Sequence, residues 1–293
     1  MIVQLWRKVV TVRKPTAIDS ETLAMPLWEL REPTTIWGEI THAIQSLYYG
    51  ALARLVYFLR YYQWRQTANA LAALLAETRS ALFTGYWLSS GKEKTFQYYG
   101  LNPISLTEEQ KEKPAILLLH GKGSNQAVWA SLAKTFQEKG IPNVFTLNSY
   151  DGELTVEDVP LFEAKLNEIR HLYGAKMPRV IVIGHSRGAE FSLYAALPPE
   201  TFKLDEGYCT QLKKWETFRP EIHKMIRLGS PLLPEEREQL PEEMLAKIYE
   251  IDGLRDLIIP DRSLTPYYQA DCGHVELLYN QEVHQKIIQL VVG

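Results

Sequence analysis

The sequence has few cysteines, no recognisable secretory signal and little net charge, and each of these features argues against a class of protein. It has 2 cysteines in 293 residues, Cys209 and Cys272, too few for a disulfide framework, so packing roles are expected for both. The amino-terminal segment lacks the charged, apolar and small-residue regions of a secretory signal, which makes the cytoplasm the default compartment. The formal net charge is -3, which implies no general attraction to nucleic acid.

Signatures of bound cofactors are also missing. The spacing of Cys, His, Asp and Glu has no form typical of a metal site, and the sequence holds no phosphate-binding loop with its lysine and hydroxyl. We therefore expect neither a metal nor another cofactor. With 46% hydrophobic and 23% charged residues, the composition is typical of a globular enzyme with one large core, or with a core domain and an appended module.

The most informative stretch is VIVIGHSRGA at 180–189. Its β-branched start is typical of a buried parallel strand, and a helix-compatible segment follows. This pattern places Ser186 on a sharp turn between strand and helix, with a strained backbone. We expect Gly184 and Gly188 to be required there, because a side chain at either position would collide with the neighbouring strand or helix.

A serine nucleophile needs an oxyanion site, and the stretch AILLLHGKGS at 115–124 offers one. It is a second apolar run that ends in a glycine-rich turn. Gly121 lets the backbone fold so that the N–H of Lys122 points inward, and the N–H of Arg187 would supply the second donor. We expect a structural role for His120.

The base and its orienting acid are sought downstream of the serine. The stretch KIYEIDGLRDLIIP at 247–260 offers Asp256 as the acid, with Asp252 and Asp261 as alternatives. The stretch YYQADCGHVELL at 267–278 offers His274 as the base after a final strand. Among the other histidines, His185 is expected to point away along the chain. The remaining ones are expected in helical patterns or on helix-like surfaces: His42, His171, His223 and His284.

The order Ser186, Asp256, His274, after an oxyanion turn at 120–124, resembles the α/β-hydrolase superfamily over residues 96–293. The elbow GHSRG and the turn HGKGS look like those of esterases, lipases and thioesterases, although many members have a second glycine where this chain has Ala189. The resemblance implies a serine hydrolase acting on a small-molecule or lipid ester or thioester, with a hydrophobic acyl group. Acyl transfer by the same triad and a non-catalytic binding protein on the same scaffold are the alternatives.

Strands and helices are expected to alternate through the catalytic part. The expected strands are 96–101, 115–119, 144–147, 180–183 and 225–228, followed by one in each downstream stretch, and the expected helices are 125–139, 156–172 and 281–292. This alternation predicts an α/β fold with a doubly wound, mostly parallel sheet and a site at the carboxyl ends of the strands. Residues 107–113 are expected to form a charged loop.

Three segments lie outside this alternation. Residues 198–223 contain four aromatic side chains and form either a lid over an acyl pocket or an ordinary connecting helix. Residues 231–245 are rich in proline and acidic side chains and are expected to be a surface excursion. Residues 36–95 form an aromatic-rich helical extension after an extended arm at 1–35.

The helical extension has two interpretations. Its region 36–88 places arginines beside tyrosines and tryptophans, which would suit a helix lying on anionic lipid. A helical hairpin docked on the hydrolase domain or on a second subunit is the favoured alternative. The apolar run at 47–59 is interrupted by Arg54 and is shorter than the ~20 residues that span a bilayer.

Overall fold

The computed structural model describes residues 100–149, 154–155, 158–176, 178–196, 222–230, 232, 237–238, 240–256, 258–259 and 266–293. The predicted arm at 1–35, the helical extension at 36–95 and the lid at 198–221 lie outside the described residues. Within those that are described, no helix is both long and apolar enough to cross a membrane.

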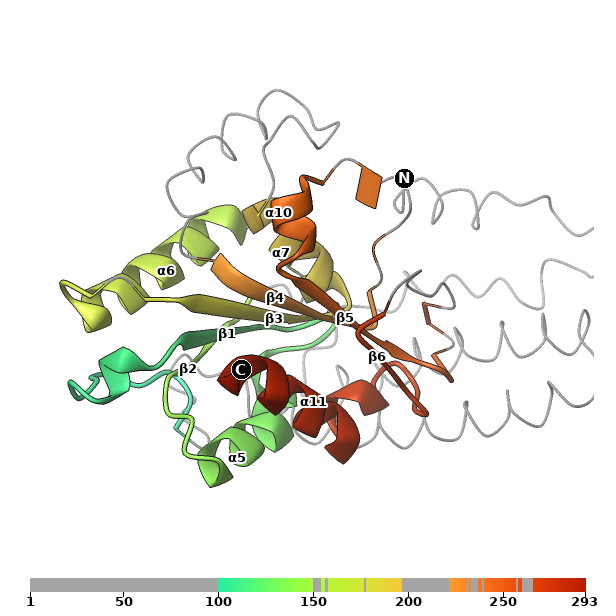
Figure 1. The fold of residues 1–293 in the computed structure, drawn as a ribbon, viewed down its shortest axis with the longest axis horizontal. Coiled ribbons are helices and arrows are strands. Elements are labelled where there is room, and N and C mark those ends of the chain that lie inside the picture. The colour runs from blue at the N-terminus through green and yellow to red at the C-terminus, as the bar shows by residue number, and fades with distance from the viewer. Residues whose placement is uncertain are drawn as a thin grey trace, which may run out of the picture. The chain divides into compact units, whose positions relative to one another are not determined.

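Six parallel strands form one sheet in the order β2-β1-β3-β4-β5-β6. The strands are β1 (Ala115–Leu119), β2 (Val144–Leu147), β3 (Val180–His185), β4 (Ile222–Leu228), β5 (Ile248–Gly253) and β6 (Tyr268–Ala270). Helices cover both faces of this sheet (Figure 1). The predicted α/β class and doubly wound parallel sheet are therefore confirmed.

The helices divide between the two faces (Figure 1). One face carries α6 (Val159–Tyr173), α7 (Arg187–Ala196) and α10 (Glu242–Leu245), and the other carries α5 (Ala130–Glu138) and α11 (Gln281–Val292). Short 3-10 turns lie at η1 (Gln110–Glu112), η2 (Gln126–Trp129) and η7 (Glu276–Leu278). The segment predicted as one helix at 125–139 is thus η2 followed by α5.

Each face of the sheet has its own apolar core, because side chains alternate along a strand. From β1, Leu117 and Leu119 enter the core beneath α6 and α7, with Phe162 and Phe191. Ile116 and Leu118 enter the opposite core with residues of α5 and α11. All five residues of β1 are buried, as expected for a central parallel strand covered on both sides.

Several predicted boundaries shift. β4 begins at Ile222 rather than at 225, so the last two residues of the predicted lid, 222 and 223, belong to this strand. At 100–101, the described part of the predicted strand 96–101, no strand forms. The chain instead lies beside the start of β2, where the N–H of Asn102 donates to the carbonyl oxygen of Val144 at 2.8 Å.

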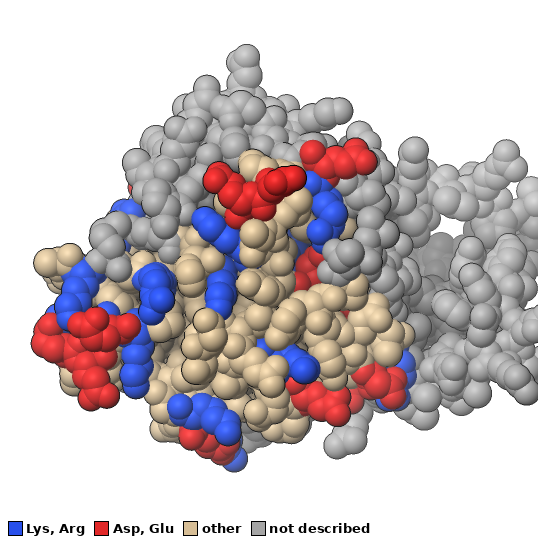
Figure 2. Space-filling view, viewed as in Figure 1, with Lys and Arg blue, Asp and Glu red and all other residues tan. Residues whose placement is uncertain are grey.

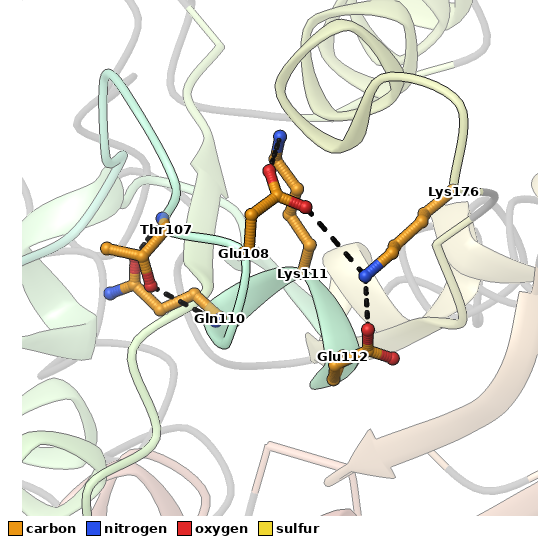
Figure 3. Close-up of polar contacts among 6 residues, drawn as sticks. All are labelled: Thr107, Glu108, Gln110, Lys111, Glu112 and Lys176. Carbon is orange, nitrogen blue, oxygen red and sulfur yellow. Dashed lines mark hydrogen bonds and ion pairs between the residues drawn. The ribbon is translucent and has the colours of Figure 1, made fainter.

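The segment 107–113, predicted as a charged loop, contains the turn η1 held by side chains (Figure 3). Thr107 and Gln110 form a reciprocal cap, in which each side chain accepts from the other residue's backbone N–H, at 2.7 and 3.2 Å. Lys176, which lies just before β3 in the sequence, pairs with Glu112 and approaches Glu108 at 3.9 Å. These exposed ion pairs connect the turn to the segment that follows α6.

The segment 231–245 is not simply a surface excursion. Leu232 and Leu240 are buried in the core beneath α6 and α7, and the carboxylate of Glu250 holds the segment in place. It accepts from Nη2 of Arg237 at 2.5 Å and from the N–H of Leu232.

On the face drawn in Figure 2, basic and acidic side chains form small groups separated by uncharged surface.

Candidate active site

The candidate nucleophile lies at the topological switch point of the sheet. β1 and β3 are neighbours, and the chain leaves them in opposite directions, toward β2 from one and toward β4 from the other. Ligands of open α/β sheets bind at such points, outside the carboxyl ends of the strands. Gly121 follows β1 and Ser186 follows β3, so the oxyanion turn and the serine turn meet there.

Ser186 has the backbone predicted for it. Its φ is 52°, in the left-handed region that non-glycine residues avoid. The N–H of Ser186 donates to the carbonyl oxygen of Leu228 on β4 at 2.9 Å, and its own carbonyl accepts from the N–H of Ala189 at 2.9 Å. The strained residue is therefore held from both sides, by the sheet and by the first turn of α7.

The glycines beside the serine are required by close packing. A Cβ at Gly184 would lie 2.5 Å from the backbone of Ala189, and one at Gly188 would lie 2.2 Å from the carbonyl oxygen of Leu119. Neither contact is possible without moving the backbone. The prediction that side chains at these two positions would collide with the neighbouring helix and strand is confirmed.

The oxyanion turn lies against the serine turn. A Cβ at Gly121 would lie 3.1 Å from Cβ of Ser186, so a side chain there would force the two turns apart by a few tenths of an ångström. Lys122 is exposed and follows Gly121 in this turn. Arg187 is the first residue of α7, where backbone N–H groups point out of the helix end, and its side chain pairs with Glu190.

His120 is held in a structural arrangement beneath the oxyanion turn. The N–H of Ser149 donates to its Nε2 at 3.1 Å, so the other ring nitrogen, Nδ1, carries the proton and donates to the carbonyl oxygen of Gly121 at 2.9 Å. Burial lowers the pKa of this imidazole, with a smaller opposing effect from the bond to Gly121. A neutral His120 therefore holds the carbonyl of Gly121 in place.

Asp256 and His274 form a buried pair. Oδ2 of Asp256 accepts from Nδ1 of His274 at 2.6 Å, and the two residues are 2% and 3% exposed. Oδ1 of the same carboxylate accepts from the N–H groups of Ile258 and Ile259, at 2.8 and 2.7 Å. These bonds fix the carboxylate's orientation and leave Nε2 of His274 as the ring nitrogen that is not facing the acid.

The alternative acids are placed differently. Asp252 is buried inside β5, where it is paired in register with Gln269 of β6. Asp256 comes four residues later, in the turn after Gly253, and this turn delivers its carboxylate to His274. Asp261 lies outside the described residues.

Three of the histidine predictions were wrong. His223 is exposed, but it lies on β4 rather than on a helix-like surface. His284 lies on α11 and is fully buried, not on a surface; its Nε2 donates to the carbonyl oxygen of Leu278 at 2.9 Å and its Nδ1 meets the hydroxyl of Thr135 at 3.1 Å. His185 does not point away from the site. Its ring lies against that of His274, with 4.6 Å between centroids.

The sequence showed His185 only as the residue before Ser186. Its contact with His274 crosses 89 positions of the chain, and no local pattern encodes it. Cys272, two residues before His274, is fully buried. In the ranges that the structure describes, no group of three or more His, Cys, Asp or Glu side chains is arranged to hold a metal ion.

These observations define the class of protein: a doubly wound α/β protein with a serine on a strained turn and a buried Asp–His pair near the carboxyl ends of its strands. Comparison with known proteins adds little to this. No protein-family model and no curated protein matches the sequence.

Solved structures with similar parts do exist. The lin2722 gene product of Listeria innocua is similar with a TM-score of 0.40 and 12% identity, over 61% of this chain and 93% of that one. A protein from Pectobacterium atrosepticum, provisionally described as a YdeN-like hydrolase, is similar with a TM-score of 0.34 and 12% identity, over 63% and 94%.

Proposed function

We propose that the protein is a serine hydrolase of the α/β-hydrolase type that cleaves a carboxylic ester or thioester. The observation that carries the proposal is the buried bond of 2.6 Å between Asp256 and His274, together with a serine whose φ is 52° at the carboxyl end of β3. Strained backbone at a strand-to-helix turn and a paired imidazole are the parts that serine catalysis needs.

In this proposal, Asp256 holds His274 with Nδ1 protonated, and Nε2 takes the proton of the Ser186 hydroxyl as its oxygen attacks the substrate carbonyl. A covalent acyl-enzyme forms when the collapsing intermediate expels the alcohol or thiol, which takes the proton back from Nε2. Water, deprotonated in turn by His274, then releases the acid and regenerates the serine.

The negative oxygen of each tetrahedral intermediate would be stabilised by the N–H groups of Lys122 and Arg187. Two features support this role. The contact between Gly121 and Ser186 brings the first turn next to the nucleophile, and Arg187 opens α7, whose amino end favours developing negative charge. Loss of one such donor costs ~10²–10³-fold in kcat in serine hydrolases.

The preference for a hydrophobic acyl group is proposed on the composition of segment 198–221, which follows the helix after the nucleophile. It contains Phe202, Tyr208, Trp215 and Phe218, and aromatic side chains are typical of apolar binding sites. Turnover of p-nitrophenyl esters of increasing acyl length tests this preference, and a rate that falls steadily with chain length contradicts it.

A fluorophosphonate probe tests the nucleophile directly. The folded wild-type protein should be labelled once, and the label should be lost in Ser186→Ala. His274→Gln, which keeps the serine but removes the base, should slow labelling without changing its site. A folded wild-type chain that takes up no label overturns the proposal.

A further inference from the structure

His185 is a buried titratable side chain that the proposed mechanism does not use, although it lies in the middle of the site. It is the last residue of β3 and is 5% exposed. Its Nε2 lies 3.0 Å from the carbonyl oxygen of His274. Because a carbonyl only accepts, Nε2 must carry the proton and donate it.

The same ring also lies against the oxyanion turn. A Cβ added at Gly121 would be 3.1 Å from Nδ1 of His185 and 3.3 Å from its carbonyl oxygen. His185 therefore contacts the turn after β1 with one side of its ring and the segment after β6 with the other. It also precedes Ser186, so its own backbone belongs to the nucleophile turn.

We infer that His185 is a positioning residue, which holds the backbone of His274 in the position from which the imidazole of His274 can reach Ser186. The bond between Asp256 and His274 fixes the rotation of the ring, but it leaves the backbone of residue 274 to be placed by other contacts. The donor on His185 supplies one of these contacts from the strand that carries the nucleophile. The distance between serine and base is then set within β3 itself.

This role requires His185 to stay neutral with Nε2 protonated while His274 gains and loses its proton. Burial and, to a smaller extent, the neighbouring His274 lower the pKa of His185 to about 3. The groups that face it are those that act on its charge: His274 and His120, which oppose it, and Asp256 and the carbonyl of His274, which favour it. A second imidazolium beside His274 is thereby avoided.

The kinetic arm of the test rests on the proposed hydrolase activity. His185→Met removes the donor and keeps an apolar side chain of similar length, and we expect kcat for an ester to fall ~10–100-fold with KM changed by less than about twofold, the size of loss typical of misplaced catalytic groups. His185→Gln, whose amide nitrogen sits at the same place along the side chain as Nε2, should recover most of this loss. His171→Gln, at an exposed position on α6, is the matched control.

A spectroscopic arm does not depend on activity. The Nδ1 proton of His274, bonded to Asp256, should give a strongly low-field ¹H resonance in the wild-type protein and in His185→Gln. In His185→Met this resonance should broaden or shift, because the backbone of His274 is no longer held. An unchanged resonance and an unchanged kcat in His185→Met overturn the inference, whereas absent turnover with the expected resonances contradicts the hydrolase proposal alone.

The wild-type protein provides a further measurement if His185→Met does not fold. ¹⁵N-labelled histidine should show His185 as the neutral Nε2–H tautomer at every pH from 5 to 8. Titration of His185 in that range, or the Nδ1–H tautomer, overturns the inference.

Discussion

Nη1 of Arg227 donates to the carbonyl oxygen of Ala189 at 3.1 Å, so a guanidinium on β4 holds the first turn of the helix that follows the candidate nucleophile. Nε of Arg227 donates to the carbonyl oxygen of Ser230 at 2.9 Å. The residue is 1% exposed and is paired in register with Gly184 on β3. The planar guanidinium of Arg227 thus connects the first turn of α7, next to the serine turn, with the turn after β4.

Replacing Arg227 by lysine should destabilise the protein more than replacing it by methionine. Lysine keeps the buried charge, but its single ammonium cannot reach both carbonyls, and a buried charge with fewer partners costs more than an apolar side chain. We expect a loss of ~3 kcal/mol for Arg227→Lys and ~1–2 kcal/mol for Arg227→Met in urea unfolding. The reverse order would mean that this position requires the positive charge rather than the several N–H donors of the guanidinium.

Gly188→Ala should be among the most destabilising single-methyl changes in the described part of the chain. The added Cβ would meet backbone oxygens of Leu119 and His120, at 2.2 and 2.6 Å, and the backbone has no soft way to move. We expect a loss above ~3 kcal/mol. Gly140→Ala is the control: its φ is 66° and nothing lies within 4 Å of the added atom, so only the backbone cost of ~1–2 kcal/mol remains. Thermal unfolding compares the two, and equal losses would contradict the packing argument.

Ser186→Gly should be more stable than Ser186→Ala. Both variants lack the hydroxyl and should be inactive, but glycine adopts a φ of 52° without the clash that any Cβ suffers there. We expect a difference of about 1 kcal/mol in favour of glycine. Urea unfolding of the two inactive variants measures it. If alanine were the more stable, the strain at this residue would have no energetic consequence.

Asp256→Asn should cost far more activity than Asp252→Asn. An amide at 256 can donate to Nδ1 of His274, which favours the tautomer with its proton on Nε2 and removes the base. We expect kcat to fall ~10⁴-fold, the loss that this change causes in a serine-protease triad. Asp252 is buried in β5, so Asp252→Asn tests whether loss of a buried carboxylate alone has the same effect. Ester turnover at matched folded concentration distinguishes the two variants, and similar losses would make Asp252 an equal candidate.

Stability should fall as the pH drops below about 6.5. The pKa of His120, His185 and His284 is lowered in the folded protein, in each case mainly by burial. Below the unfolded pKa, the unfolded chain binds protons that the folded chain does not. Keeping these imidazoles neutral therefore costs nothing above that pH, and it reduces the free energy of unfolding progressively below it. Between its unfolded and its folded pKa, each histidine contributes at most ~1.4 kcal/mol per pH unit.

Urea unfolding at pH 7, 6 and 5 measures this slope. His284→Gln should reduce it, because one buried imidazole is gone, and the exposed His171→Gln should leave it unchanged. A slope in His284→Gln equal to that of the wild type would show that His284 does not contribute.

The sequence was sufficient for the parts of the fold that local patterns encode. The runs at 115–119 and 144–147 became β1 and β2 with unchanged bounds, because short runs made up mainly of apolar residues suit strands covered on both faces. Gly184 and Gly188 could be assigned in advance because their need is local, at one turn. The order Ser186, Asp256, His274 predicted that Asp256 would be the partner of His274, and the two side chains are bonded.

What the sequence did not predict depends on contacts between distant strands. Arg227 is a charged residue in an apolar strand, and its burial is explained by the carbonyl oxygen of Ala189 in α7 and that of Ser230 after β4. Asp252 and Asp256 lie on either side of one glycine turn, and the choice between them depends on where β6 places His274. His185 was misjudged for the same reason.

The order of the strands along the chain sets when the candidate site is completed during synthesis. His274 follows β6, the last of the described strands in the sequence, whereas Ser186 follows β3, near the middle of the sheet. A nascent chain that has left the ribosome only as far as β5 has its serine turn but no imidazole beside it. In the proposed mechanism, the serine is thus synthesised well before the base that would activate it, so the proposed activity would require β6 to have joined the sheet.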